Sequence, residues 1–390
     1  MARGRGDEER LASLEQLFAA KEIVIHCGSG GVGKTTTAAA AGAEAAIHLG
    51  GKVLVLTVDP AKRLANALGL EQFGNVETRV PPEAFAEAGV EPRGELYAAM
   101  LDTKQSWDDL IRRHAPDEKT RDAILANPLY QNLMGRFVQS HDYIAMERLY
   151  DIHSSGTYDL IVVDTPPTRN AIDFLEAPAR MADFFSSRFL RWLTVPARSR
   201  VLNYASKPFY TIADRILGSQ FLEDIAEFFL LFQSMYDGFV ARANAVTRVL
   251  GDRRTTFVVV STLESAPVRE AQYFISELRS RDLHLGAVVL NKVLPDYLLG
   301  RDATRSAQRM CNEAPALAKQ LSGGNDPAVL QRVLHEVGNS FLNFQVVANR
   351  EAETRAELSS IPDVVATVPY FDSDIFDLGG LVRLGDKIWR

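Results

Sequence analysis

A short glycine-rich stretch carries the strongest chemical signal in the chain. Residues 28–36 read GSGGVGKTT and satisfy the pattern G-x-x-x-x-G-K-[ST] between an apolar run and an alanine-rich helical segment. Backbone N–H groups of such a loop turn toward phosphate, Lys34 reaches the β- and γ-phosphates, and the Thr35 hydroxyl ligates Mg²⁺. A glycine-rich turn without a ligand is the alternative, which this context disfavours. We therefore expect a nucleoside triphosphate site made of Gly28, Ser29, Gly30, Gly31, Val32, Gly33, Lys34, Thr35 and Thr36.

Two aspartates follow apolar runs that read as buried strands. Asp164 comes directly after the run 159–163, and Asp59 comes directly after the run 52–58. Ligands of open α/β sheets bind beyond the carboxyl ends of the strands, so we expect both carboxylates to face the nucleotide. Asp164 is in the position of an aspartate that holds Mg²⁺ through water. Either residue could instead cap the helix that follows it, since aspartate is a good N-cap.

The residues after a third apolar run favour adenine over guanine. Guanine-specific phosphate-loop proteins use N-K-x-D, whose aspartate accepts the ring hydrogens of guanine. Here Asn291 and Lys292 are followed by Val293 and Leu294, and no carboxylate stands at that place. We therefore expect the nucleotide to be ATP, although an asparagine that simply ends a strand in a turn is the alternative for Asn291.

Short apolar runs that alternate with helical patterns predict the elements that position these residues. The pattern is typical of an α/β fold in which helices cover both faces of a parallel sheet. We expect a doubly wound, mostly parallel sheet of about seven strands at 22–27, 52–58, 95–101, 159–163, 256–261, 285–290 and 362–368.

The chain also carries more helix than the crossovers of such a sheet require. The excess lies at about 103–153 and 170–250, and we expect it to form a helical subdomain inserted into a single domain of residues 1–390. Apolar residues recur at helical spacing over 221–239, which predicts a helix buried on more than one side or waiting for a partner. A third helical region at 327–348 shows the apolar stripe Leu330, Leu334, Val337, Phe341 and Phe344.

Composition limits the classes of protein that this chain can be. Its net charge of −7 argues against a general nucleic-acid binder, which would carry a basic surplus. Cys27 and Cys311 are its two cysteines, so no disulfide framework is implied. The N-terminal stretch has no apolar core of signal-peptide length, and no apolar run is long enough to cross a bilayer. We expect a cytoplasmic protein, peripheral at the membrane at most.

Three motifs together resemble a known family. The loop GSGGVGKTT, the segment DPAKRLANALG of residues 59–69 and the segment DTPPTRNAIDFL of residues 164–175 resemble the arsenite-pump ATPase family. That family includes the targeting factors for tail-anchored membrane proteins, and the resemblance covers almost the whole chain. It implies a phosphate-loop NTPase of the deviant Walker A class, whose dimer opens and closes with ATP and handles a client through helices.

The resemblance also implies roles for single residues. Asp59 matches the switch I aspartate that positions or activates the attacking water, and residues 164–168 match switch II, which senses the γ-phosphate. Asn291 matches the residue that reads the adenine edge, and Pro369 lies where the family's chain passes the base. Lys34 and Asp59 are therefore the expected catalytic residues, and Thr35 and Asp164 are the expected Mg²⁺ residues.

Ser29 departs from the family at the second position of the loop. The family's lysine there reaches across the dimer and stabilises transition-state charge, as an arginine finger does. Serine is too short and uncharged for this, and the chain has a single phosphate loop, so a functional pair needs a second chain. We expect a homodimer or, preferably, a heterodimer with a paralogue that carries the lysine. Lys62 or Arg63 could also substitute for it.

The family's zinc site has no counterpart in this sequence. The targeting factors clamp zinc between subunits with a CxxC pair, whereas residues 311–314 read CNEA and offer one thiol. Two copies of Cys311 give two thiolates, short of the four ligands of a structural zinc site. We expect ATP and Mg²⁺ as cofactors, and no zinc.

The client surface and the overall role keep alternatives open. The segment 188–215 is basic and apolar, which suits a membrane surface or an amphipathic helix of a client, although an ordinary solvated face on a packed helix is the simpler interpretation. A positioning ATPase of the MinD or ParA kind, and a regulatory subunit with little hydrolysis, are the two other functions. The apolar C-terminal residues Leu381, Leu384, Ile388 and Trp389 could make a membrane helix, but we expect them to dock on the domain.

Overall fold

The chain folds around one mixed sheet. The structure is a computed structural model of the 390-residue chain. It describes residues 13–58, 63–70, 74–133, 138–166, 168–186, 228–321, 323, 326–359, 362, 364–371 and 373–389. Eight strands form the sheet in the order β3-β4-β2-β5-β1-β6-β7-β8, and all neighbours are parallel except β3 and β4. The strands are β1 (Ile23–Cys27), β2 (Lys52–Thr57), β3 (Thr78–Arg79), β4 (Glu95–Met100), β5 (Leu160–Asp164), β6 (Thr255–Ser261), β7 (Leu285–Val293) and β8 (Val364–Pro369).

The expected sheet is confirmed, with one addition. All seven predicted strands are present, and the fold is the doubly wound, mostly parallel α/β sheet that the alternation of runs indicated. The eighth strand, β3, was not predicted. It is two residues long and pairs antiparallel with Tyr97 and Ala98 at the edge of the sheet, too short to leave an apolar pattern.

The two faces of the sheet bury alternate residues of the same strands. Ile23 and Ile25 of β1 belong to one core cluster, and Val24 between them belongs to the other. Successive side chains of a strand point to opposite faces, so a strand covered on both sides must be apolar throughout. This is why the strands read as continuous apolar runs.

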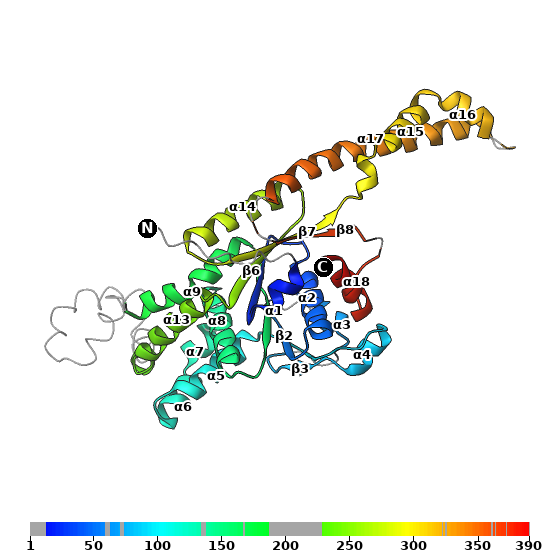
Figure 1. Cartoon of the computed structure of the whole chain (residues 1–390). Helices are drawn as coiled ribbons and strands as arrows, with labels where there is room; N and C mark the ends of the chain where they lie inside the picture. Colours follow the sequence, from blue (N-terminus) through cyan, green and yellow to red (C-terminus); the bar gives the residue numbers. More distant parts are fainter. Residues whose placement is uncertain are drawn as a thin grey trace, which may run out of the picture.

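One face is covered by the helix that follows the glycine-rich loop. Alanines and Gly42 of α2 are buried almost all round the helix, and a Cβ on Gly42 would lie 2.4 Å from Val55 of β2. This small surface lets α2 lie close to the sheet and still receive the C-terminal helix on its other side (Figure 1). The helices of this face are α1 (Leu14–Ala19), α2 (Lys34–His48), α3 (Arg63–Ala67), α4 (Pro82–Glu87) and α18 (Leu378–Ile388).

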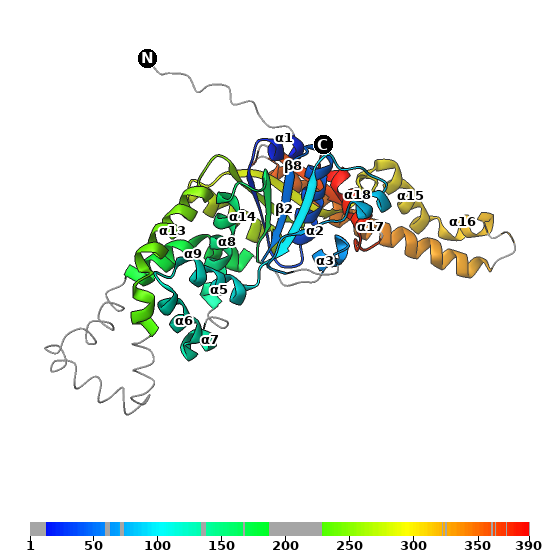
Figure 2. The same cartoon turned by 90° about the horizontal axis from the view of Figure 1, so that it is seen from below.

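The opposite face carries the larger helical layer. Its core holds Trp107, Tyr143, Phe232 and Phe239, so the described part of the apolar stripe at 221–239 packs in the interior. Figure 2 shows these helices on one side of the sheet. They are α5 (Thr103–His114), α6 (Glu118–Ala126), α7 (Pro128–Leu133), α8 (Val138–Ser154), α9 (Thr168–Ser186), α13 (Tyr236–Leu250) and α14 (Ser265–Ser280).

A third group of helices leaves the body between β7 and β8. It contains the short helix η2 (Asp296–Leu299), α15 (Arg301–Asn312), α16 (Ala314–Leu321) and α17 (Pro327–Leu358). We call α15, α16 and α17 the arm, because both views show them extending away from the sheet (Figures 1 and 2). The predicted helical region 327–348 is therefore the first part of a helix of 32 residues.

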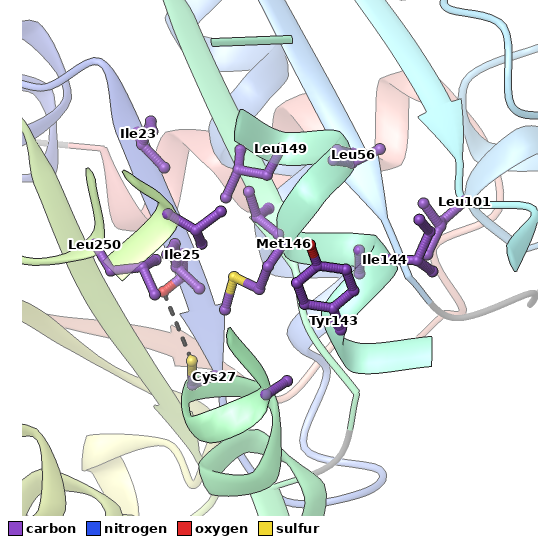
Figure 3. Packing of buried hydrophobic residues seen from close by; sticks show 14 of the residues in the cluster. Ile23, Ile25, Cys27, Leu56, Leu101, Tyr143, Ile144, Met146, Leu149 and Leu250 are labelled. Carbon is purple, nitrogen blue, oxygen red and sulfur yellow. Dashed lines mark hydrogen bonds between the residues drawn. The ribbon is translucent and has the colours of Figure 1, made fainter. Parts of the chain in front are cut away.

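The C-terminal residues dock on the domain as expected, and Cys27 at the end of β1 lies in the core. Cys27 is a buried core residue, and Figure 3 shows it among Ile25, Met146 and Leu250. Leu381, Leu384, Ile388 and Trp389 are buried where α18 packs on α2. Within the described part of the chain, none of the helices is long and apolar enough to cross a membrane.

Candidate functional site

The glycine-rich loop joins β1 to α2 and wraps the end of the central strand. Gly33 has a φ of 95°, a left-handed conformation that glycine adopts without strain, and it caps the start of α2. At Gly28 the backbone passes so close to β6 that a Cβ would lie 2.1 Å from the carbonyl oxygen of Val260. Among the described residues, nothing lies within 4 Å of a Cβ built on Gly30 or Gly31. The loop is thus closely packed on one side and open on the other, as a phosphate cradle requires.

Lys34 and Ser29 face each other across this loop. Lys34 is 7% exposed, and its ammonium donates to the Ser29 carbonyl oxygen at 3.0 Å. The Ser29 hydroxyl is buried, and no described group accepts or donates a hydrogen bond to it. A buried hydroxyl without a partner is costly, so a ligand oxygen at this point would be favourable. The serine side chain is therefore enclosed by the protein rather than exposed to solvent.

A carboxylate and two hydroxyls meet beside the loop. Asp164 Oδ2 accepts hydrogen bonds from Thr35 Oγ1 at 2.7 Å and from Thr57 Oγ1 at 3.0 Å. The register of the sheet explains this, because Asp164 on β5 lies next to Thr57 on β2 and to His26 on β1. All three oxygens belong to hard ligands of the kind that Mg²⁺ prefers. The donor set therefore fits a magnesium ion held by Thr35 and Asp164.

Sequence reasoning did not single out Thr57. Its signal was a hydroxyl at the end of an otherwise apolar strand, two residues before Asp59. Thr57 is fully buried, and the aliphatic residues before it in β2 need no such polar group. Its hydrogen bond crosses between parallel strands that are more than 100 residues apart in sequence, a pairing that no local pattern shows.

Asn291 braces the loop from the end of β7. Its amide donates to the Val32 carbonyl oxygen at 2.7 Å, and its carbonyl oxygen accepts from the Lys292 N–H at 2.9 Å. A Cβ on Gly33 would lie 2.2 Å from Asn291 Nδ2, so glycine at 33 makes room for this contact. Pro369 ends β8 and pairs with Val293, which brings it to the same edge of the sheet. The structure thus gathers residues 28–36, Asp164, Asn291 and Pro369 at the edge of the sheet formed by the carboxyl ends of its parallel strands.

Two buried groups next to the loop are kept uncharged. Burial lowers the pKa of His26 to about 3, so its imidazole is neutral at physiological pH. Burial raises the pKa of the Cys27 thiol to about 12, which leaves no reactive thiolate. Neither residue takes part in the donor set, and both serve the packing of β1.

Other predicted residues lie outside the described part of the chain. These are Asp59 and Lys62, together with the basic segment 188–215 and the first residues of the stripe at 221–239. Arg63 begins α3, and residues 164–166 of switch II run from the end of β5 toward α9.

A second cluster of charged residues lies in the helical layer. His114, Glu147 and Asp151 each place a possible metal ligand within 4.8 Å of the others. Arg242 of α13, however, donates to both Glu147 and Asp151, and Arg113 pairs with Asp151 at 2.5 Å. Two guanidinium groups already balance the two carboxylates, so the cluster is an ion-pair network that ties α13 to α8 and α5. Burial nevertheless raises the pKa of the Glu147 carboxyl.

Comparisons with known proteins agree with this geometry. The family model described as "Anion-transporting ATPase" matches residues 21–314. The chain is similar to a protein of Cryptosporidium parvum named "ATPase ASNA1 homolog", with 26% identity over 72% of this chain and 68% of that protein. It is also similar to proteins named "ATPase GET3". The one from Komagataella phaffii is 25% identical over 68% of this chain and 71% of its own length. The one from Malassezia globosa is 25% identical over 74% and 78%.

Proposed function

Because the chain belongs to the anion-transporting ATPase family, we propose that it hydrolyses ATP with Mg²⁺ and uses the nucleotide to control its pairing with a second subunit. The observation that carries the proposal is the meeting of Lys34, Thr35 and Asp164 beside an open glycine loop. Lysine, hydroxyl and carboxylate at this edge are the groups that bind a triphosphate and its metal ion.

Each residue has a role in this proposal. Lys34 balances charge on the β- and γ-phosphates, while the loop N–H groups hold the phosphate oxygens. Thr35 and Asp164 hold Mg²⁺, which when bound neutralises charge on the same oxygens. Asp59 activates or positions the attacking water from the segment after β2. Asn291 and Pro369 flank the base, and Asn291 keeps one N–H and one carbonyl lone pair beyond the two hydrogen bonds it already makes.

The helical layer is where we place the client. Switch II, residues 164–168, connects β5 directly to α9, so a change at the γ-phosphate has a short covalent path to the helices. We propose that residues 103–153 and 170–250 act as a helical subdomain of a single ATPase domain. A membrane protein or another client would bind there, and the protein would work in the cytoplasm or at the membrane surface.

Ser29 makes the identity of the second subunit part of the proposal. A homodimer of this chain would have two sites, neither of which receives a lysine from position 29. We therefore prefer a heterodimer with a paralogue that carries lysine at this position, so that the nucleotide bound here receives its cation in trans. Lys62 or Arg63 could take that role in a homodimer.

Two other functions remain in view. A regulatory subunit that binds ATP and hydrolyses little is favoured by Ser29, an uncharged residue whose hydroxyl is buried. A positioning ATPase of the MinD or ParA kind would use the same loop chemistry, but such proteins are compact and lack a helical layer of this size.

Single-site variants of the purified chain test the hydrolysis itself. Thr35→Ala and Asp164→Asn should each lower the rate of ATP hydrolysis at least about a hundredfold, because each removes a Mg²⁺ group. Thr37→Val is the matched control, since the Thr37 hydroxyl bonds only to the backbone carbonyls of Gly33 and Lys34 at the start of α2 among the described groups. If the first two variants hydrolyse ATP at the wild-type rate, the proposed site is wrong.

Mixing with the lysine-bearing paralogue tests the pairing. The chain alone should hydrolyse ATP slowly, and the mixture should be faster than the sum of its parts. Native mass spectrometry of the complex isolated with ATP should show the heterodimer mass and any client. Fast hydrolysis by a pure homodimer would contradict the heterodimer, and ATP binding without hydrolysis in the mixture would favour the regulatory subunit.

A further inference from the structure

The arm uses one side of α17 for its own packing. Gly338 faces α15 so closely that a Cβ there would lie 2.6 Å from Cys311 Sγ and 2.7 Å from the carbonyl oxygen of Ala307. Ala307, Ala314 and Ala318 are buried against the same side of α17. Small residues at the contact let the helices approach closely, and this inner side accounts for Leu330, Leu334 and Phe341 of the predicted stripe.

A second apolar line runs along α17 beside this inner side. Val333, Val337, Phe344 and Val347 are 45% to 56% exposed, and exposed Ser340 lies between Val337 and Phe344. We call these five residues the outer seam. Their spacing alternates between four and three residues, the repeat with which a helix packs along its length against another helix. The arm's own helices leave this seam uncovered.

The seam is complementary to itself when two copies run antiparallel. A twofold axis near residues 342 and 343 places Val337 opposite Val347 of the second copy. The same axis places Phe344 opposite Ser340 of the second copy, so that a large side chain meets a small one. The parallel arrangement would instead place Phe344 against Phe344 and Ser340 against Ser340, which packs less evenly.

Charges on the flank of the seam match the same register. Glu336, Asn343 and Arg350 lie seven residues apart along one edge of the seam, and all three are exposed. In an antiparallel pair the same edge of both helices meets. Glu336 of each copy then faces Arg350 of the other copy, which gives two equivalent pairs, and the two Asn343 residues face each other. In a parallel pair this edge would face the opposite one, where Ala348 is buried and Phe341 is half-buried.

We propose that the outer seam of α17 docks a second copy of this chain, antiparallel, through the arms. In this register Val337, Phe344 and Val347 meet the second copy over about three turns, which makes a short interface, so the association is weak enough to depend on concentration in vitro. It uses no residue of the nucleotide site and does not rest on the proposed function. An ATP-driven pair could therefore be joined to another pair through its arms.

Sedimentation of the full chain without nucleotide and with EDTA tests this contact apart from any nucleotide-driven pairing. The wild type should shift from monomer to dimer as its concentration rises, and Val337→Glu should remain monomeric. Val346→Glu is the matched control, because Val346 is 61% exposed but lies off the seam, and it should dimerise as the wild type does. A wild type that stays monomeric, or a Val337→Glu variant that still dimerises, would overturn the proposal.

Charge reversal tests the register. Glu336→Arg and Arg350→Glu should each weaken the dimer about tenfold, since each turns two attractive pairs into repulsive ones. The double variant Glu336→Arg/Arg350→Glu should restore the wild-type affinity, and failure of this rescue would refute the antiparallel pairing.

Cross-linking distinguishes the two orientations directly. In a Cys311→Ser background, a short bis-maleimide should link Asn343→Cys to its own copy efficiently and Ser340→Cys poorly. A parallel pair would link Ser340→Cys better, and that result would overturn the proposal. Circular dichroism of each variant shows whether the arm is still folded.

Discussion

Asp164 shows how much of the site depends on one oxygen atom. Its Oδ2 accepts from both Thr35 and Thr57, so the orientation of the carboxylate is held by two hydroxyls from different elements. Residues 28–36 could be predicted from the sequence because they are consecutive, so their motif can be read without knowing the fold. Thr57 could not be predicted, since its partner is brought to it by strand pairing. Asp59, which the sequence also singled out, lies outside the described residues.

Replacement of Thr57 should change the response to magnesium. Thr57→Val keeps the shape of the side chain but removes one donor to Asp164, so we expect about a tenfold higher Mg²⁺ concentration for half-maximal hydrolysis. The loss of one hydrogen bond to a charged group is of this size. Thr57→Ser keeps the donor and should behave as the wild type. As a second measurement, the release rate of a fluorescent nucleotide is followed at increasing Mg²⁺ concentration in the wild type and in Thr57→Val. An unchanged Mg²⁺ requirement in both assays would contradict this role.

At the scale of elements, α2 and α17 show what periodicity can and cannot predict. The alanine-rich helix α2 is buried on nearly all sides, and its composition alone indicated a helix that packs closely. For α17 the predicted stripe mixed two sides. Leu330, Leu334 and Phe341 lie on the inner side of α17 and are half-buried, whereas Val337 and Phe344 lie on the exposed outer seam. Apolar spacing predicts a helix and the extent of its apolar surface. Which part of that surface is buried depends on where α15 packs.

The docking of α18 on α2 depends on Trp389, the residue that caps the C-terminus of α18. Trp389 is 1% exposed and packs edge-on against Phe18 of α1, with ring centroids 5.3 Å apart. Trp389→Ala should lower the free energy of unfolding by about 3 to 5 kcal/mol, the usual cost of removing a buried aromatic side chain. Lys387→Ala, at an exposed position of the same helix, is the control. Denaturant unfolding measures both, and equal stability of the two variants would show that α18 contributes little.

At the scale of the whole molecule, the sheet is covered on both faces, and the three neighbouring strands β5, β1 and β6 are buried at every residue. Every residue of β1 is buried, and this includes a histidine. Burial lowers the pKa of His26 from 6.5 to about 3. The unfolded chain therefore binds a proton at this residue below pH 6.5, while the folded chain does not until about pH 3. Stability from this residue is complete above pH 6.5 and is lost as the pH falls.

Removal of His26 should make the fold less sensitive to acid. Between pH 7.5 and pH 5 the wild type should lose about 2 kcal/mol of unfolding free energy through this residue. His26→Leu keeps the volume and the backbone contacts of β1, and it should lose that much less over the same range. Urea unfolding at the two pH values gives the loss of unfolding free energy for each protein. The two losses are then compared, so that the contributions of the other titrating groups cancel. Equal acid sensitivity of the two proteins would mean that His26 is solvated in the native state.

The sequence by itself determined the parts of this protein that are local in the chain. It determined the phosphate loop, because nine consecutive residues supply it, and the strands and helices, because their periodicities are local. The tertiary structure alone decided what lies beside what. It buried the Ser29 hydroxyl, placed the Thr57 hydroxyl on Asp164 and the Asn291 amide on the loop, joined Arg242 to Glu147, and left the outer seam of α17 uncovered. These contacts join residues far apart in the chain, and they follow from strand order and helix packing, which no short stretch of sequence records.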